Sequence, residues 1–414
     1  MSRHRNHAVP GSGVYLTEVV KALAKEGHTQ NVLAGIARGE QMDMPDGVKT
    51  YPVYFESEGL PYPVVGMSDE MPYISTKYKD MTEEMTVQFR NAFLAVLDEV
   101  IEREDPELIL CHHLYYLTAL VRERYPEKKV YGFCHNTDLR QMKNTSFQRE
   151  FIRSQIPRLD RIFALQEAQK EKIRQIYPVK SESMTVIGTG YNSHVFRITG
   201  EKPGKKDDVV RLVFAGKITQ KKGVKSLLRA MNLLDEESGQ IKLVLAGGAG
   251  NQKEYEEIKE LAAHCRYPVR FAGCVPQMEL AKLYNDGDIF VLPSMYEGLP
   301  LTVIESLACG DRVVMTRLDG VTDWLEDMLP DADIRYVDLP KMKGADEAVE
   351  EELPAFAKKT GAGNWKMQIR TVKQENRGLV KNRVCDVSGI SWQKIAQEVI
   401  RSKKIIKESG KIIG

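Results

Sequence analysis

The chain lacks the features of three large protein classes. No stretch of its 414 residues approaches the roughly 18 consecutive apolar positions that a membrane-spanning helix needs. The 59 basic and 58 acidic residues leave a formal net charge of +1, so no global positive field gathers nucleic acid. The six cysteines are scattered without Cys-x-x-Cys spacing, which argues against a zinc site. We therefore expect a cytoplasmic protein with reduced thiols and no nucleic-acid partner.

The chain has instead the composition and the periodicity of an α/β protein. Short apolar runs alternate with helical patterns over residues 108–187 and, more regularly, over residues 211–315, as in parallel sheets with crossover helices. Residues 197–208 are rich in glycine and lysine, which indicates a linker. We predict two Rossmann-like doubly wound domains, residues 1–196 and 209–388, that face a central cleft.

Three further segments have less regular patterns. Residues 341–363 are charged and rich in Ala, Glu and Lys, which favours a variable surface excursion. Residues 389–414 are expected to form a closing helix, because apolar residues recur at helical spacing. The lysines and paired isoleucines of its end could make a peripheral membrane contact, although docking on the protein body is the favoured alternative. Residues 1–10 lack the buried strand that should open such a domain, so we hypothesise that the first strand is missing and that the natural chain starts upstream.

The most informative motif occupies residues 293–310 and reads Pro-Ser-Met-Tyr-Glu-Gly-Leu-Pro-Leu-Thr-Val-Ile-Glu-Ser-Leu-Ala-Cys-Gly. A strand is expected to end near Pro293, and a helix to begin near Pro300, where proline suits the first helical position. Such a junction presents free backbone N–H groups and the positive end of the helix dipole to an anion. It is predicted to bind a diphosphate through Leu299, Leu301 and Thr302.

Two glutamates flank this predicted diphosphate site. Glu305 lies one turn into the helix, where a carboxylate can accept both hydroxyls of a ribose. Glu297 precedes Gly298 on the loop and is expected to face the sugar, because a carboxylate beside the departing pyrophosphate would be repelled. With its Glu-x7-Glu spacing, the whole string resembles the fourth family of retaining glycosyltransferases, which have the GT-B fold. The resemblance implies transfer of a hexose-type sugar from a UDP- or GDP-linked donor to an acceptor hydroxyl, and donor contacts at Gly298.

A second match lies at residues 214–223, Phe-Ala-Gly-Lys-Ile-Thr-Gln-Lys-Lys-Gly, which resembles the family's Gly-Arg-Leu-x-x-x-Lys-Gly loop. The resemblance implies that Gly216, Lys217 and Lys222 bind the donor phosphates, and that the two lysines stabilise the leaving group. Lys217 replaces the usual arginine, so it would meet a phosphate as a point charge without a bidentate fork. A solvated, lysine-rich loop is the alternative interpretation.

Two elements of the first half are similar to the family's remaining site elements. Gly11, Ser12 and Gly13 precede an amphipathic helix expected over residues 14–26, and the resemblance implies a glycine-rich loop that approaches the donor phosphates. A plain entry loop is the alternative.

His135-Asn-Thr-Asp138 follows the strand expected over residues 130–134 and looks like the family's His-Gly-x-Asp element. The resemblance implies that His135 sits under the transferred sugar; a structural histidine is the alternative. Asp138 and Arg140 are expected to fix the loop. His112 and His113, at another strand end, either line the acceptor pocket or have a neutral core role.

We expect neither a metal nor a cofactor. Two Asp-x-Asp pairs, at residues 286–288 and 331–333, have the spacing of metal sites in other glycosyltransferases, but the first is interpreted as a helix-to-strand turn and the second as a polar loop. Lysines and the helix dipole would replace the cation. A sugar-nucleotide epimerase of the same architecture and a catalytically weak sugar-nucleotide-binding protein are the alternatives. No motif in the sequence identifies the acceptor as a glycan, a lipid or a small molecule.

Overall fold

The protein is described here by a computed structural model. It describes residues 11–68, 71, 73–199, 209–236, 239–249, 251–344, 347–359, 366–376 and 385–409. From residue 9 onward the chain divides into two compact units, residues 9–190 with 392–414, and residues 191–391. The division at residue 190 precedes the linker expected over residues 197–208, of which residues 200–208 lie outside the described part.

The second unit is built on one six-stranded parallel sheet in the order β11-β10-β9-β12-β13-β14. Counted along the unit, this is the order 3-2-1-4-5-6 of a doubly wound sheet, as predicted. The strands are β9 (Val210–Ala215), β10 (Ile241–Ala246), β11 (Val269–Gly273), β12 (Ile289–Leu292), β13 (Arg312–Thr316) and β14 (Ile334–Val337). The central strand β12 is buried at every position, as expected for a strand covered on both faces.

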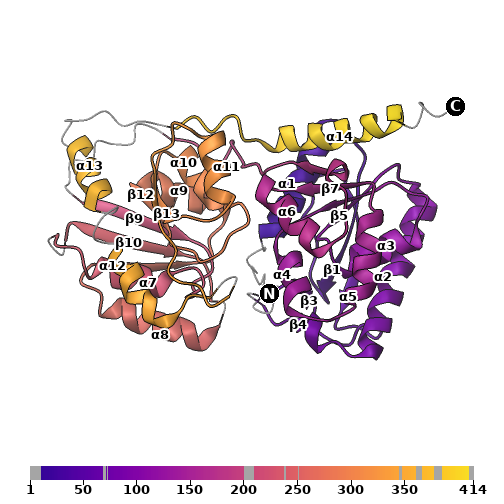
Figure 1. The fold of residues 1–414 in the computed structure, drawn as a ribbon, viewed down its shortest axis with the longest axis horizontal. Helices are drawn as coiled ribbons and strands as arrows, with labels where there is room; N and C mark the ends of the chain where they lie inside the picture. The colour runs from indigo at the N-terminus through magenta and orange to yellow at the C-terminus, as the bar shows by residue number, and fades with distance from the viewer. Residues whose placement is uncertain are drawn as a thin grey trace. The chain divides into compact units, whose positions relative to one another are not determined.

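Helices cover both faces of this sheet (Figure 1). In that view α9, α10 and α11 lie above the sheet, and α7, α8 and α12 lie below it. Helix α7 buries Val224, Leu227, Leu228 and Met231, whose spacing places them on one helical face. The bounds are α7 (Val224–Met231), α8 (Gln252–Ala263), α9 (Gln277–Asp286), α10 (Leu301–Ala308) and α11 (Val321–Met328).

The segment at residues 341–363 is not only a surface excursion. After the short turn η4 (Glu350–Glu352), helix α12 (Leu353–Lys359) packs against α7 and buries Leu353, Phe356 and Ala357. The prediction was wrong for this helix because three apolar residues at i, i+3 and i+4 suffice to bury one face of a short helix. Helix α13 (Lys366–Asn376) follows and contacts β9.

The first unit has parallel strands in three separate sheets. The pairs are β1 with β2 and β3 with β4, and the third sheet has the order β5-β6-β7-β8. No described strand joins the first pair to the four-stranded sheet; the hypothesis of a missing first strand concerns residues 1–10, which lie outside the described residues. The bounds are β1 (Asn31–Ala37), β2 (Lys49–Phe55), β3 (Val65–Gly66), β4 (Thr76–Lys77), β5 (Ile109–His112), β6 (Val130–Phe133), β7 (Arg161–Ala164) and β8 (Met184–Val186).

Helices pack on these sheets around an aromatic core. Phe89 and Phe93 of α2 stack at a centroid distance of 4.3 Å, and both contact Phe55 of β2. Residues 137–155 form two helices and not one, because the backbone at Gln148 turns left-handed, with φ of 45°. The bounds are α2 (Glu83–Glu104), α3 (Tyr116–Arg124), α4 (Thr137–Asn144), α5 (Arg149–Gln155), α6 (Glu167–Ile176), η1 (Tyr78–Asp80), η2 (Ile156–Arg158) and η3 (Ser181–Ser183).

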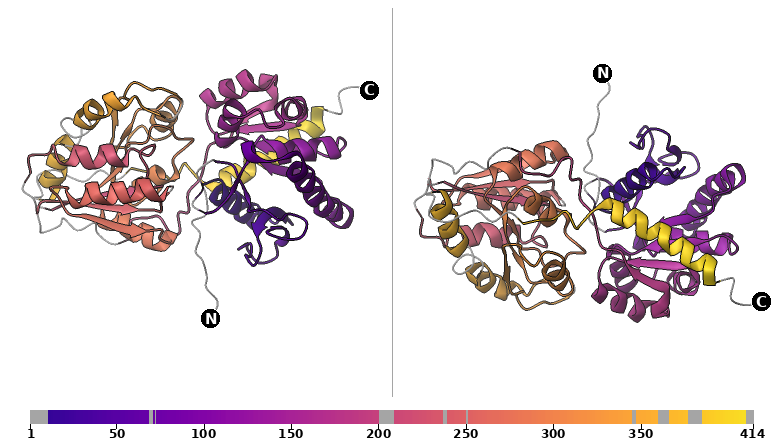
Figure 2. Two further views of the ribbon diagram at one scale, coloured as in Figure 1. Left: turned by 90° about the horizontal axis from the view of Figure 1, so that it is seen from below. Right: turned by 90° about the horizontal axis from the view of Figure 1, so that it is seen from above.

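The closing helix α14 (Trp392–Ser409) belongs to the first unit. It lies beside α1 (Gly11–Lys25), as both views of Figure 2 show. The rings of Trp392 and Tyr15 meet edge to face with centroids 4.9 Å apart. Side chains beyond residue 403, including the paired isoleucines, lie outside the described part. None of the helices seen over the described residues is both long and apolar enough to cross a membrane.

Helix α1 begins at Gly11, so Gly11, Ser12 and Gly13 form its first turn. The glycine loop expected ahead of a helix over residues 14–26 is therefore wrong as a local structure. Glycine is a poor helix former in the middle of a helix. In a first turn, however, the N–H groups lack intrahelical acceptors whatever the residue, so the glycines remain compatible with a helical start.

Candidate active site

The two motif-bearing loops of the second unit follow neighbouring strands. β9 ends at Ala215 and leads into residues 216–223, whereas β12 ends at Leu292 and leads into residues 293–300. In the 3-2-1-4-5-6 order these are strands 1 and 4, between which the strand order reverses. Ligands of open α/β sheets bind outside the carboxyl ends of the strands at this switch point. The topology therefore puts both predicted donor-binding loops at the standard ligand position of the fold.

Gly223 allows the two loops to approach each other closely. Its φ of +73° is left-handed, and a Cβ there would lie 2.0 Å from the carbonyl oxygen of Pro293. The Met295 N–H donates to the carbonyl oxygen of Lys221 at 2.9 Å, which ties the loops together two residues before Gly223. Only a residue without a side chain fits this crossing.

An ion pair also joins the two loops. Lys222 Nζ donates to Glu297 Oε1 at 2.6 Å, and the two side chains are 26% and 13% exposed. The Lys222 N–H also bonds Thr219 Oγ1 at 3.3 Å, which helps to hold the lysine backbone in the turn. A partly buried lysine and a mostly buried carboxylate thus meet at the switch point, with enough exposure left to contact a ligand.

The helix that follows Glu297 begins next to Pro300, close to the predicted start. Pro300 is the N-cap in extended conformation, and Leu301 is the first residue of α10. Gly310 follows the helix with φ of +82°, and the Asp311 N–H donates to the carbonyl oxygen of Ser306 at 3.0 Å, as expected for a glycine-terminated helix. Glu305 lies in the second turn and is 6% exposed. The first N–H groups of α10, at Leu301 and Thr302, have no intrahelical acceptors.

Both Asp-x-Asp pairs have structural partners. Asp288 Oδ2 accepts from the N–H of Arg211 at 2.7 Å, at the start of β9. Asp333 forms an ion pair with Arg312 and accepts from Gln368 Nε2 at 2.8 Å. Among the residues that the structure describes, no group of three or more His, Cys, Asp or Glu side chains could hold a metal ion.

In the first unit, three histidines gather at the carboxyl ends of β5 and β6. These parallel strands pair His112 with Phe133, so His112 and His113 lie beside His135, which follows Cys134 after β6. His112 Nδ1 and His135 Nε2 are 3.0 Å apart. His113 has φ of +71° and its ring nitrogen Nδ1 lies 3.3 Å from Thr137 Oγ1.

Burial keeps these imidazoles neutral. It lowers the pKa of His112 to about 3, with a further lowering from His113. The pKa of His135 also lies well below its usual range because of burial, followed by the charges of His113 and His112. Burial lowers the pKa of His113 too, partly opposed by Asp138. At neutral pH each ring therefore has one N–H and one acceptor nitrogen.

Asp138 fixes the loop that contains His135. This carboxylate is fully buried, and its Oδ2 accepts from the Leu114 N–H at 2.7 Å while both oxygens lie 3.3 Å from the His135 N–H. It therefore joins the loop after β5 to the loop after β6. The expected loop-fixing role of Asp138 agrees with these contacts. Arg140, also expected to fix this loop, donates from Nη2 to Ser68 Oγ at 2.8 Å.

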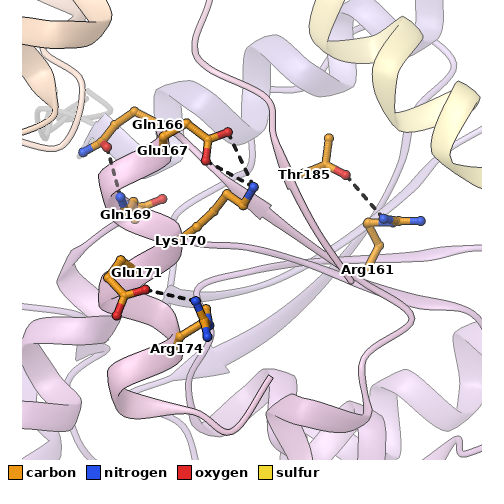
Figure 3. A network of polar contacts seen from close by, with 8 residues as sticks. All are labelled: Arg161, Gln166, Glu167, Gln169, Lys170, Glu171, Arg174 and Thr185. Carbon is orange, nitrogen blue, oxygen red and sulfur yellow. Dashed lines mark hydrogen bonds and ion pairs between the residues drawn. The ribbon is translucent and has the colours of Figure 1, made fainter. Parts of the chain in front are cut away.

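A second buried contact supports the same loop from α6. Asn136 has φ of 67°, and its Oδ1 accepts from Gln169 Nε2 at 2.7 Å. The Gln169 N–H is in turn capped by Gln166 Oε1 at 3.0 Å, a contact visible in Figure 3 beside the ion pairs on the exposed side of α6. Asn136, the positive-φ residue next to His135, is thus held by the side chain of Gln169, which is itself fully buried.

The comparisons with known proteins bear on both units. Residues 9–195 match Glycosyltransferase Family 4, and residues 196–328 match Glycosyl transferases group 1. The chain belongs to the glycosyltransferases. An uncharacterized glycosyltransferase of Methanocaldococcus jannaschii is 30% identical over 171 residues, which are 39% of this chain and 43% of that protein. The chain thus spans less than half the length of that relative.

Two other similar proteins match a larger share of the glycosyltransferase. D-inositol 3-phosphate glycosyltransferase of Kribbella flavida is 24% identical over 344 residues, 77% of each chain. Sucrose-phosphate synthase from Thermosynechococcus elongatus has a similar structure, with a TM-score of 0.64 and 16% identity over 96% of this chain and 94% of that one. The predicted GT-B fold is confirmed.

The structure brings some predicted site residues of the glycosyltransferase together. Lys222 and Glu297 are paired, Gly216 and Lys217 begin the same loop as Lys222, and Glu305 lies on the helix after Glu297. Gly298 and Leu299 end the loop before the N-cap Pro300, and Leu301 and Thr302 are the first two residues of that helix. His135 and residues 11–13 belong to the other unit. The sequence left the role of His112 open, although its position at the end of the strand before the His135 strand indicated a place near His135.

Substituting Asp138 by asparagine should destabilise the first unit of the glycosyltransferase by about 1–3 kcal/mol, because one amide NH2 would then oppose a backbone N–H in a buried site. Chemical denaturation followed by circular dichroism measures the change. Asp98→Asn is the matched control, since the Asp98 carboxylate pairs with Arg124 at 2.9 Å and is 39% exposed. Equal losses in both variants would contradict the role of Asp138.

Proposed function

We propose that this glycosyltransferase transfers a hexose-type sugar from a nucleotide-diphosphate donor to an acceptor hydroxyl, with retention of configuration and without a metal ion. The observation that supports it best is the 2.6 Å ion pair between Lys222 and Glu297 at the switch point of the second unit. A lone lysine would suit many anions. A lysine next to a carboxylate suits a ligand that carries a diphosphate and neutral hydroxyls side by side.

The donor phosphates are proposed to lie against the start of α10. Its free N–H groups and dipole favour an anion, as do the amino groups of Lys217 and Lys222. These groups supply the positive charge that a divalent cation provides elsewhere, and they stabilise the charge that develops on the leaving diphosphate. The proposed donor-binding residues are Gly11, Ser12, Gly13, Gly216, Lys217, Lys222, Gly298, Leu299, Leu301, Thr302 and Glu305.

The chemical step follows from the charges of these groups. As the bond from the anomeric carbon to the phosphate oxygen breaks, the sugar gains oxocarbenium character, which Glu297 and His135 are proposed to stabilise. The acceptor hydroxyl attacks from the face that the diphosphate leaves, and its proton passes to the departing phosphate oxygen. No covalent intermediate with the protein forms in this scheme, and configuration is retained.

Glu305 provides the test of the donor site. Its carboxylate is proposed to accept both hydroxyls of the ribose, so Glu305→Gln should weaken binding of UDP or GDP about tenfold or more, since hydrogen bonds to a charged group contribute roughly 1.5–3 kcal/mol. Isothermal titration with UDP, GDP and ADP measures the loss and identifies the preferred base. Transfer from the corresponding nucleotide sugars is then assayed by release of diphosphate.

The matched ligand is the 2′,3′-dideoxy form of the preferred nucleotide. Because it lacks the ribose hydroxyls, wild type and Glu305→Gln should bind it equally. Glu279→Gln, on the neighbouring helix α9, is the control variant, because Glu279 is an exposed carboxylate paired with Lys282. If Glu305→Gln bound all nucleotides as tightly as wild type did, the donor site would lie elsewhere.

A further inference from the structure

The rings of His112 and His135 meet edge to edge. Their planes differ by 15°, their centroids are 5.2 Å apart, and Nδ1 of His112 lies 3.0 Å from Nε2 of His135. Two stacked rings could not bring ring atoms so close, because nonbonded carbon atoms stay about 3.5–4.0 Å apart. The geometry is that of an N–H···N hydrogen bond within a shared plane.

Such a bond couples the protonation of the two neutral rings. If His112 Nδ1 carries the hydrogen and donates, Nε2 of His135 accepts, and the hydrogen of His135 is on Nδ1. If His135 Nε2 donates, its Nδ1 is left as an acceptor. The tautomer of one ring therefore dictates that of the other, since each neutral imidazole has one N–H.

Neighbouring side chains hold both rings in this plane. The His112 ring stacks on Phe133 at 4.7 Å with an interplanar angle of 7°. The Tyr15 ring meets His135 edge to face at 5.1 Å, and the Tyr15 hydroxyl donates to the carbonyl oxygen of Gly188 at 3.1 Å. Across the residues that the structure describes, no hydrogen bond reaches Nδ1 of His135, and the side chain remains partly exposed.

We propose that His112 is a positioning residue that fixes the tautomer of His135, and thereby decides whether Nδ1 of His135 donates to or accepts from a hydroxyl of the transferred sugar. This inference rests on the proposed function, in which His135 contacts that sugar. His112 itself touches no substrate in this scheme. It acts only through the ring that it orients, as do the outer partners of ligating histidines.

Two substitutions separate the hydrogen bond from the packing. His112→Phe keeps a ring that can stack on Phe133 but removes the ring nitrogen. His112→Asn places an amide near the position of Nδ1 and can restore the bond. His113→Asn is the control, because asparagine tolerates the left-handed backbone at residue 113 and the ring of His113 makes no hydrogen bond to His135.

The first readout is the pair of ring ¹⁵N chemical shifts of His135, recorded with histidine-labelled protein and assigned with a His135→Gln variant. Wild type should give one protonated and one unprotonated ring nitrogen. His112→Phe should move both shifts toward averaged values, because the free ring exchanges between tautomers, and His112→Asn should restore the separation. Retention of one unchanged tautomer in His112→Phe would overturn the proposal.

The second readout is steady-state transfer from the donor identified by titration. His112→Phe should lower kcat about tenfold or more with little change in the donor KM, and His112→Asn should recover part of the loss. A shifted tautomer with unchanged kcat would refute a role in transfer. If wild type itself transferred no sugar, the proposed function would fail, and the ¹⁵N shifts alone would still decide whether His112 controls the His135 tautomer.

Discussion

Replacing Lys222 by alanine is expected to lower kcat for sugar transfer about a thousandfold, the scale of losing one preorganised group that stabilises developing charge. The ammonium of Lys222 lies at the switch point, where the leaving diphosphate is proposed to gain charge. Lys217 and the start of α10 remain in the variant and keep part of the ground-state affinity. Initial rates at saturating donor, together with titration of the nucleotide, separate the two effects.

Lys225→Ala is the control for Lys222→Ala, because Lys225 is also a partly buried lysine paired with a glutamate. Lys225 pairs with Glu257 at 2.7 Å and has 22% of its side chain exposed, close to the values for Lys222. Lys225→Ala should leave kcat nearly unchanged, because Lys225 belongs to helix α7 and not to the loop. A loss in Lys222→Ala no larger than that in Lys225→Ala would remove the basis for its catalytic role.

Truncation of Lys222 also leaves the Glu297 carboxylate without its 2.6 Å partner, which could repel the donor phosphates. The double variant Lys222→Ala/Glu297→Ala distinguishes the two causes. If repulsion by Glu297 caused the loss, the double variant would regain activity. We expect no recovery, because Glu297 is itself proposed to stabilise the sugar in the transition state, and coupled residues of one site do not add.

The second unit was predictable from sequence because its strands are short, apolar and regularly spaced. The strands β9 to β13 span residues 210–316, within one residue at each end of the predicted range 211–315, whereas β14 lies beyond that range and was not predicted. The contact between the two loops was not predictable in the same way. That Lys222 meets Glu297 follows from β9 lying next to β12, a pairing of strands that are not consecutive in the chain. The motif resemblance predicted both residues but not their contact.

The strands and helices of the first unit were harder to predict from the sequence. No elements were predicted between residues 28 and 107, where the structure has β1 to β4 and α2. β1 includes Ala34, Gly35 and Ala37, which are weak strand formers, and β2 contains Pro52, which is unusual inside a parallel strand, so neither segment gives a strong strand signal. The bond between His112 and His135 was not predictable, because it depends on ring orientations set by Phe133 and Tyr15.

Gly223→Ala is expected to lower the stability of the second unit by about 3 kcal/mol, from a left-handed non-glycine residue and an overpacked contact. The new Cβ would lie 2.0 Å from the Pro293 carbonyl oxygen, and a main-chain atom cannot rotate away as a side chain can. For a unit of this size the melting temperature should fall by about 6–12 °C. Scanning calorimetry measures the shift.

Gly273→Ala separates the two causes of this loss. Gly273 has φ of +70°, close to the +73° of Gly223, but a Cβ there meets nothing within 4 Å. Its substitution should therefore cost only the left-handed conformation, about 1–2 kcal/mol. The excess loss in Gly223→Ala measures the close approach of the two loops, and donor binding should fall with it because the loops must separate. Equal melting temperatures for the two variants would mean that the loops accommodate a Cβ at residue 223 without a steric clash.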